Sequence, residues 1–167
     1  MIKARKIGIL LGILILAIIL GIILVSYISH LIEIRSLQDV ILKFIRSAQL
    51  RDRDSLREVC GGKVFVNLFS GNMEINEYYI GELNKQFPSS AQIKFLRIYQ
   101  SSEFLPEEKR KYGFIAWKVN LLVIDEKNQY VGGYSFYVSK VTELDEAGNE
   151  TTLYKILDIL KVGDILF

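Results

Sequence analysis

Reactive and metal-binding side chains are scarce in this 167-residue chain, which has one cysteine, one histidine and two prolines. A single cysteine forms neither an intrachain disulfide nor a cysteine-rich zinc site. A single histidine removes most catalytic triads and histidine metal centres. We therefore expect no metal and no cofactor, and the composition favours a protein that is not an enzyme.

Excess charge is lacking as well, with 21 Lys and Arg residues against 19 Asp and Glu residues. A net charge of +2 gives no reason to expect a nucleic-acid partner. Hydrophobic residues make up 50% of the chain, which excludes intrinsic disorder. The length allows one ordinary domain and an appendage.

The appendage is an uncharged segment near the N-terminus. Residues 7–29 read IGILLGILILAIILGIILVSYIS. As a helix this segment reaches about 34 Å, enough to cross about 30 Å of hydrocarbon. Lys3, Arg5 and Lys6 precede it, so the positive-inside rule keeps the N-terminus in the cytoplasm. The sequence predicts a cytoplasmic tail at 1–6, a transmembrane anchor at 7–29 and an extracytoplasmic domain at 30–167.

The anchor is too long for the apolar region of a cleaved signal peptide, and no clean small-x-small site follows it. We therefore expect it to be retained. Gly8 and Gly12, then Ala17 and Gly21, place small residues four positions apart. This spacing lets two membrane helices approach closely, so these four residues are candidates for helix pairing.

The rest of the chain predicts an α+β domain that begins with helices. Apolar residues recur on one face of a helix from Ser36 to Ala48, with Ser36 as its N-terminal cap. Asp54 precedes a short helix that Gly61 and Gly62 end. Alternating residues predict a short strand at 63–69, and a further helix is expected from Met73 to Phe87.

After residue 91 the pattern changes to the alternation of antiparallel strands, expected at about 92–104, 112–125, 130–143 and 151–162. The separators at 106–111, 126–129 and 145–149 read as hairpin loops.

The register of the two middle strands follows from a two-residue turn at Lys127 and Asn128. That turn places Trp117, Val119 and Leu121 opposite Val138, Phe136 and Tyr134, which brings large apolar residues to one face. A bend near Gly132 and Gly133 would curve this four-stranded meander around the helices.

This order of elements resembles the nuclear-transport-factor-like superfamily. Residues 40–48 (VILKFIRSA) and then 51–56 (RDRDSL) are similar to the family's first helix and the turn into its second. The resemblance covers most of residues 31–162 and implies a cone-shaped fold. Because the superfamily contains enzymes, ligand binders and scaffolds, the fold alone does not select a function.

An enzyme of this fold would need an acid–base pair in the cone. The available hydroxyls are those of Tyr78, Tyr79, Tyr99, Tyr134, Tyr137 and Tyr154, and the available carboxylates are those of Asp125 and Asp158. Asp158 stands in the otherwise apolar run Ile156–Leu160 and becomes a functional candidate if it is buried. The alternative is that it faces solvent, because antiparallel strands commonly expose one face to water.

Five aromatic residues predict either a packed core or the wall of an apolar ligand cavity. Together with Asp158 they are the candidate ligand-binding residues: Phe87, Phe95, Trp117, Phe136 and Tyr154.

We expect a single-pass membrane protein that displays an interaction or scaffold domain outside the cytoplasm. Its expected partners are the lipid bilayer and a protein, either a different one or a second copy of the chain. The topology resembles inner-membrane assembly factors of type IV secretion and conjugation systems, which implies a bacterial cell envelope. The alternative is a membrane-tethered binder of a small apolar ligand.

Overall fold

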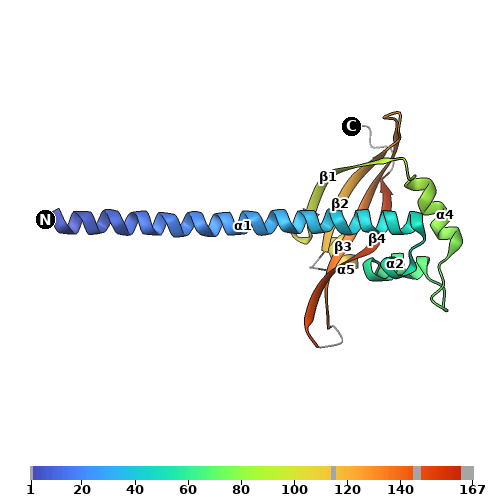
Figure 1. Cartoon of the computed structure of the whole chain (residues 1–167), viewed down its shortest axis with the longest axis horizontal. Coiled ribbons are helices and arrows are strands. Elements are labelled where there is room, and N and C mark those ends of the chain that lie inside the picture. Colours follow the sequence, from blue (N-terminus) through green and yellow to red (C-terminus); the bar gives the residue numbers. More distant parts are fainter. Residues whose placement is uncertain (1, 114–115, 145–147, 163–167) are drawn as a thin grey trace. The chain divides into compact units, whose positions relative to one another are not determined.

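The computed structural model describes residues 2–113, 116–144 and 148–162, with side chains from Gly12 onward (Figure 1). The chain divides into two compact units, Met1–Arg35 and Ser36–Phe167. The second unit combines helices with a curved, four-stranded antiparallel sheet, which confirms the predicted α+β class.

The described residues of the first unit lie within helix α1 (Ile2–Leu50). Because residues 30–36 contain neither glycine nor proline, nothing local ends the helix there, and the predicted start at Ser36 is wrong. The side chains of Ile13, Leu20 and Val25 are each more than half exposed. By length and composition this helix can cross a membrane.

The part of α1 that belongs to the second unit carries the apolar face predicted from its spacing. Leu37, Ile41 and Phe44 are fully buried. The ring of Phe44 meets the ring of Phe136 edge-on, with 6.1 Å between their centroids. This helix face therefore forms one side of the domain core.

Helix α2 (Arg53–Val59) begins two residues earlier than predicted because Asp52 caps it. The Asp52 carboxylate accepts a hydrogen bond from the backbone N–H of Ser55 at 3.2 Å. The strand predicted at 63–69 is wrong, since the residues form helix α3 (Gly62–Leu68). Val64 and Leu68 are both buried, and their spacing of four matches a helical face.

Glycine is required between α2 and α3, where the chain runs along the edge of strand β4 (Glu150–Val162). The N–H of Gly61 donates to the carbonyl of Ile156 at 2.9 Å. Gly62 has a φ of +49°, and a Cβ there would lie 3.0 Å from the carbonyl oxygen of Leu157. The two glycines predicted to end α2 therefore also let the chain approach the sheet closely.

Helix α4 (Glu77–Gln86) is shorter than predicted. The side chain of Asn76 accepts from the N–H of Tyr79 at 3.3 Å and fixes the first turn. At its other end the Gln49 amide donates to the carbonyl of Phe87 at 2.9 Å, which ties α4 to α1.

The sheet has the order β1-β2-β3-β4, with β1 spanning Gln92–Gln100, β2 Ala116–Ile124 and β3 Tyr130–Leu144. Trp117 pairs with Val138, Val119 with Phe136, and Leu121 with Tyr134. The predicted register is therefore confirmed.

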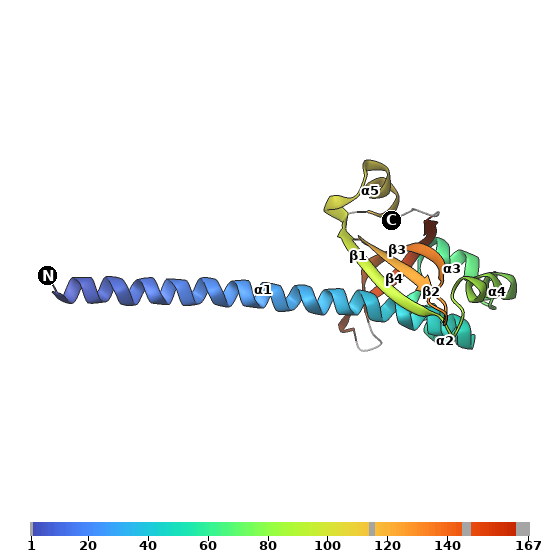
Figure 2. The same ribbon diagram turned by 90° about the horizontal axis from the view of Figure 1, so that it is seen from above.

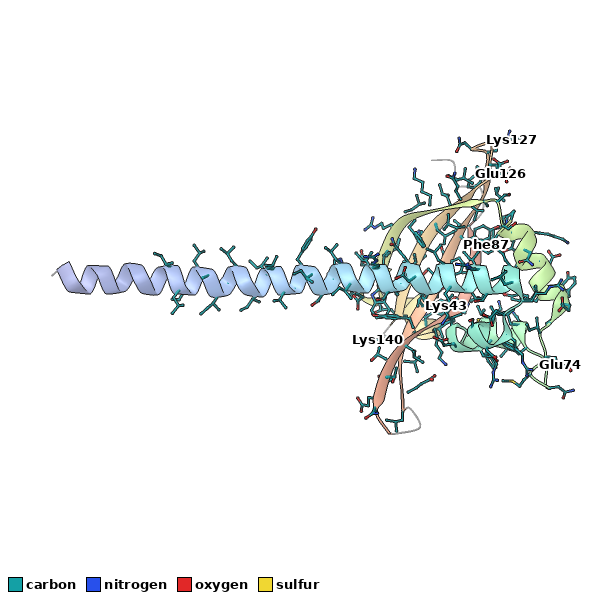
Figure 3. All side chains as sticks on the ribbon, viewed as in Figure 1. Lys43, Glu74, Phe87, Glu126, Lys127 and Lys140 are labelled. Carbon is teal, nitrogen blue, oxygen red and sulfur yellow. The ribbon has the colours of Figure 1, made fainter. Side chains whose placement is uncertain are left out.

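The turn that produces this register differs from the predicted one. The N–H of Asp125 donates to the carbonyl of Gln129 at 2.9 Å, so this bond closes a turn of three residues, with Glu126 and Lys127 at its tip (Figure 3). Asn128 adopts a φ of +60°. A register shift beside Val131, next to Gly132, compensates for the additional loop residue.

The loop predicted at 106–111 is instead helix α5 (Pro106–Tyr112), which follows the short helix η1 (Ser101–Glu103). Strand β1 ends at Gln100, where η1 begins. The loop predicted at 145–149 lies partly outside the described residues, and Leu144 pairs with Glu150 beside it.

Different helices pack on the two faces of the sheet. We call the face that carries Trp117, Val119 and Phe136 the inner face; its residues pack with those of α1, α2, α3 and α4 in the main core. The opposite, outer face carries Ala116 and Tyr137, which form a second small core with Phe104. In Figure 2, α5 stands apart from α2, α3 and α4. The outer face is therefore the one that η1 and α5 cover.

Candidate functional site on the outer face of the sheet

One row of paired residues crosses all four strands on the outer face. Tyr99 of β1 pairs with Lys118 of β2, Lys118 with Tyr137 of β3, and Tyr137 with Asp158 of β4. Paired residues in antiparallel strands project to the same side. The row therefore gathers two tyrosines, a lysine and a carboxylate on one surface.

A β-bulge places Asp158 in this row. The β3–β4 register shifts so that Val138 pairs with Ile156 while Tyr137 pairs with Asp158, which leaves Leu157 as the extra residue. In a regular strand Asp158 would share the side of Ile156, which is fully buried in the main core. The bulge instead turns the carboxylate toward the outer row, where its residue is 3% exposed.

Helix α5 lies over this row and adds three polar side chains: Glu108, Lys111 and Tyr112. Asp158 Oδ2 accepts hydrogen bonds from Lys111 Nζ and from the Tyr112 hydroxyl, both at 2.8 Å. Asp158 Oδ1 accepts from the N–H of Ile159 at 3.0 Å. The buried carboxylate is thus satisfied at both oxygens.

Glu108 holds the middle of the row in a similar way. Its Oε1 accepts from the Tyr137 hydroxyl at 2.6 Å and from Lys118 Nζ at 2.9 Å. Its Oε2 accepts from the N–H of Leu105 at 3.0 Å, at the start of α5. We call the network of Glu108, Lys111, Tyr112, Lys118, Tyr137 and Asp158 the α5 clasp.

Aromatic rings alternate with cations along the clasp. Tyr112 stacks on Tyr137 with 3.9 Å between ring centroids and 17° between ring planes. Lys118 Nζ lies 5.7 Å from the ring of Tyr137 and 5.9 Å from the ring of Tyr99. These contacts add packing and cation–π attraction to the hydrogen bonds that hold α5.

Charges in the clasp are fixed at neutral pH. Burial by itself raises the pKa of the Asp158 carboxyl, but the hydrogen bonds from Lys111 and Tyr112 outweigh it and leave that pKa below its ordinary value. Burial acts on Glu108 in the same direction, and hydrogen bonds from Tyr137 and Lys118 lower its pKa overall.

The pKa values of Lys111 and Tyr137, which donate these hydrogen bonds, are raised instead. The hydrogen bond to Asp158 raises the pKa of Lys111 to about 12, and burial raises the pKa of Tyr137. These shifts keep Asp158 and Glu108 ionised and Lys111 and Tyr137 protonated at neutral pH, so the hydrogen bonds of the clasp persist there. Its geometry favours attachment of α5 to the sheet.

Beside the clasp the outer face is hollowed into a groove of about 330 Å³. We call it the outer groove, and it is lined by Leu96, Arg97, Tyr99, Asn120, Leu121, Leu122, Tyr130, Gly133, Tyr134 and Val162. Gly133 leaves room there, since a Cβ at that position would lie 3.1 Å from the Tyr130 hydroxyl and 3.7 Å from Leu122.

The outer groove is mostly apolar and has a single charged side chain among its described lining residues, Arg97. The guanidinium lies 4.5 Å from the centre of the Tyr99 ring and 3.4 Å from the Glu103 carboxylate. Polar groups within the groove pair with the sheet, as the Ser135 hydroxyl donates to Asn120 at 2.9 Å. Lys94 pairs with Leu122 in the neighbouring row and adds a second positive charge nearby.

The five aromatic residues predicted as a core or a ligand cavity lie with the main core. Phe87, Trp117 and Phe136 are buried, while Phe95 and Tyr154 are partly buried against them. Phe87 and Phe136 lie 5.8 Å apart between ring centroids, and Trp117 and Tyr154 lie 5.7 Å apart. Figure 3 shows Phe87 between α4 and the strands.

Asp158 is separate from these five residues, because the bulge assigns it to the outer row. The structure therefore brings the aromatic part of the predicted ligand site together without its carboxylate. A ligand among the aromatic residues stays a prediction.

The residues predicted to pair membrane helices lie on α1. Ala17 is exposed, and a Cβ built at Gly12 or Gly21 meets no described atom within 4 Å. Gly8 is helical, and its surroundings lie outside the described side chains. Pairing of two copies through this segment stays a prediction.

Sequence reasoning identified two members of the clasp, Asp158 and Tyr137, and missed Glu108, Lys111, Tyr112 and Lys118. A signal for α5 is nevertheless present in the sequence. Pro106 opens the helix, Glu107 and Glu108 occupy its first turn, and basic residues occupy its last turn. This charge order is typical of a helix and not of a solvated loop.

Comparison with protein-family models, curated proteins and solved structures finds no match to this chain. Among the described residues no group of three His, Cys, Asp or Glu side chains is arranged to hold a metal ion.

Proposed function

We propose that the chain is a single-pass membrane protein whose α+β unit is an interaction domain outside the cytoplasm. The anchor is residues 7–29, and the positive charges of Lys3, Arg5 and Lys6 keep the N-terminus in the cytoplasm. The element order similar to the nuclear-transport-factor-like superfamily supports a scaffold of this kind, and a cell-envelope assembly is the setting that this topology favours.

The observation that carries the interaction role is the outer groove. The inner face is occupied by the main core, whereas part of the outer face beside α5 is an apolar hollow. Leu96 and Tyr130 line it and are 43% and 47% exposed. Apolar side chains grouped at an exposed hollow are typical of a surface that another molecule covers.

The occupant that this surface fits is an apolar side chain of a protein partner flanked by a carboxylate. The described lining of the groove contains Arg97 and no acidic residue, and Lys94 lies in the adjoining row. Because Glu103 already pairs with Arg97, Lys94 is the charge that an acidic partner segment would mainly complement. Opposite charges across an interface increase specificity and association rate.

Site-specific photo-crosslinking in the native membrane tests this function. A photoreactive residue replaces Leu122 or Tyr130 in the full chain, and the matched controls carry it at Val66 or Tyr78, which are 72% and 78% exposed on α3 and α4. We expect a discrete protein adduct from the groove positions and none from the controls. Equal labelling at all four positions, or no adduct at any of them, would contradict the proposal.

The orientation is tested separately by cysteine labelling of intact cells. Cys60 is 2% exposed, so it contributes little background. We expect Tyr78→Cys to react with a membrane-impermeant maleimide, and Lys6→Cys to react only after permeabilisation. The reverse pattern would place the domain in the cytoplasm.

The volume of the groove, about 330 Å³, also supports the second function, a membrane-tethered binder of a small apolar ligand. Mass spectrometry of the same crosslinked samples separates the two functions. A protein adduct supports the interaction domain, whereas a small-molecule adduct at Leu122 or Tyr130 supports the binder.

A further inference from the structure

A second hollow, separate from the outer groove, lies between α3, α4 and β4. It measures about 290 Å³, and we call it the polar cleft. Its lining residues are Lys63, Asn67, Tyr79, Glu82, Leu83, Gln86, Asp158, Ile159 and Lys161. Unlike the outer groove it is lined mainly by polar and charged side chains.

The two acidic residues of the polar cleft are neutralised by lysines that do not line it. Glu82 Oε1 lies 2.7 Å from Lys85 Nζ. Asp158 Oδ2 lies 2.8 Å from Lys111 Nζ, within the α5 clasp. Both negative charges of the cleft are therefore already paired.

The two lysines of the cleft form no close ion pair of their own, although the charge of Lys63 helps to lower the pKa of the Asp158 carboxyl. Within residues 2–113, 116–144 and 148–162, no carboxylate lies within ion-pair distance of Lys63 or Lys161. Both side chains belong to exposed residues, one on α3 and one on β4. Once the two acids are counted with Lys85 and Lys111, the cleft has an excess of positive charge, from Lys161 and from Lys63, which shares Asp158 with Lys111.

Neutral hydrogen-bond donors complete the lining. Burial is the main cause of the raised pKa of Tyr79, so its hydroxyl is protonated at neutral pH, while a hydrogen bond with Asn67 opposes that shift. The Tyr79 hydroxyl and the Gln86 amide both line the cleft and carry hydrogens that a ligand oxygen can accept.

We propose that the polar cleft binds the phosphate group of a small phosphorylated molecule, held by Lys63, Lys161 and the Tyr79 hydroxyl. Lysine binds phosphate as a point charge, whereas the planar fork that favours bidentate carboxylate recognition belongs to arginine, which is absent from the described lining. Leu83 and Ile159 supply an apolar wall for the remainder of the molecule. This site is independent of the protein partner proposed for the outer groove.

Calorimetric titration of the full chain with inorganic phosphate tests the site. The protein is held in phosphatidylcholine nanodiscs, with sodium chloride at matched ionic strength as the reference titrant. We expect saturable phosphate binding that weakens at least tenfold in the double variant Lys63→Gln with Lys161→Gln. The control variant Lys127→Gln with Lys140→Gln makes the same change in charge at exposed lysines outside both hollows, and we expect it to bind like the parent.

The single variant Tyr79→Phe removes only the hydroxyl and keeps both charges, so it tests the site even if the double variant does not fold. We expect its phosphate affinity to fall several-fold. The thermal melting of the domain, followed through Trp117 emission, should remain cooperative. Equal phosphate binding by the parent, the double variant and Tyr79→Phe would overturn the site, as would an absence of binding by the parent.

Nanodiscs that contain phosphatidic acid identify the source of the phosphate. A lipid headgroup that occupies the cleft would compete, so added phosphate would bind more weakly in these nanodiscs than in phosphatidylcholine alone. Unchanged binding in both membranes supports a soluble phosphorylated molecule. Either result requires the intact cleft lysines, and neither depends on the crosslinking outcome at the outer groove.

Discussion

Lys111 Nζ lies 2.8 Å from Asp158 Oδ2, although the lysine side chain is 54% exposed on α5 and the aspartate side chain is 4% exposed in β4. The pair therefore spans from solvent to the interior of the outer face. Because the two ends differ in burial, removal of each partner has a different consequence.

We predict that Asp158→Ala destabilises the domain more than Lys111→Ala. Loss of the carboxylate leaves the Tyr112 hydroxyl and the Ile159 N–H without their acceptor, at a cost of roughly 1–3 kcal/mol. Loss of the Lys111 ammonium leaves the Asp158 carboxylate its hydrogen bonds from Tyr112 and from the Ile159 N–H, so it costs less, about 1 kcal/mol. Urea unfolding followed by Trp117 emission measures both, with Arg110→Ala on the exposed side of α5 as the control. Losses at both positions no larger than that of Arg110→Ala would show that the clasp does not hold α5.

We predict that stability is greatest on a plateau from about pH 5 to pH 10. The lowered pKa values of Glu108 and Asp158 stabilise the folded state above their ordinary values of 4.5 and 3.8, and this contribution is lost as the pH falls through the folded-state values. The raised pKa of Tyr137 stabilises the fold below its ordinary value of 10.0, and this contribution is lost as the pH rises.

Melting temperatures measured across this range check the plateau. The variant Tyr137→Phe should flatten the alkaline side, and Asp158→Asn the acid side. If the plots of melting temperature against pH for both variants coincide with that of the parent, Tyr137 and Asp158 are not the cause of the pH dependence.

We predict that Trp117→Ala lowers the free energy of unfolding by roughly 3–5 kcal/mol. Trp117 is 8% exposed, pairs with Val138 and contacts the ring of Tyr154, so its removal leaves a cavity in the main core. In the parent, its emission should be blue-shifted, and the variant is followed by circular dichroism because it has no other tryptophan. A red-shifted parent spectrum would show that the ring is exposed.

We predict that Gly62→Ala costs about 1–2 kcal/mol, because φ at this position is +49° and the new Cβ would press on the carbonyl of Leu157. Gly71→Ala is the matched control, since its new Cβ meets no described atom within 4 Å. Thermal melts of both variants measure the difference. A similar effect at the two positions would mean that the contact between Gly62 and β4 is not required.

The predictable part of the fold is the part determined by long apolar patterns. The alternation in β2 and β3 is strong enough to fix Trp117 opposite Val138, and it remains correct although the turn has one more residue than expected. The extra residue is absorbed by the bulge at Val131, because a one-residue slip would turn the whole buried face toward solvent.

The errors fall where local sequence is ambiguous or where distant contacts decide. Residues 63–69 alternate like a strand, yet Val64 and Leu68 also share a helical face, and seven residues are too few to separate the two patterns. Helix α5 has no buried residue of its own and is held by Glu108 and Lys111, so hydrophobic periodicity cannot reveal it.

The candidate site is less predictable than the fold for a related reason. Asp158 is noticeable in the sequence because its neighbours are apolar, but its partners Lys111 and Tyr112 are 47 and 46 positions away. The bulge at Leu157 that directs it to the outer face leaves no pattern in the strand itself.

The contact between Phe44 and Phe136 has a consequence for the order in which the domain is made. The ribosome releases the apolar face of α1 long before β3, against which it packs. Until β3 emerges, the ring of Phe44 and its buried neighbours have no sheet to cover them, so the main core assembles late in synthesis. A nascent chain of this protein therefore presents an uncovered apolar helix for most of its elongation, a state in which chaperone binding competes with aggregation.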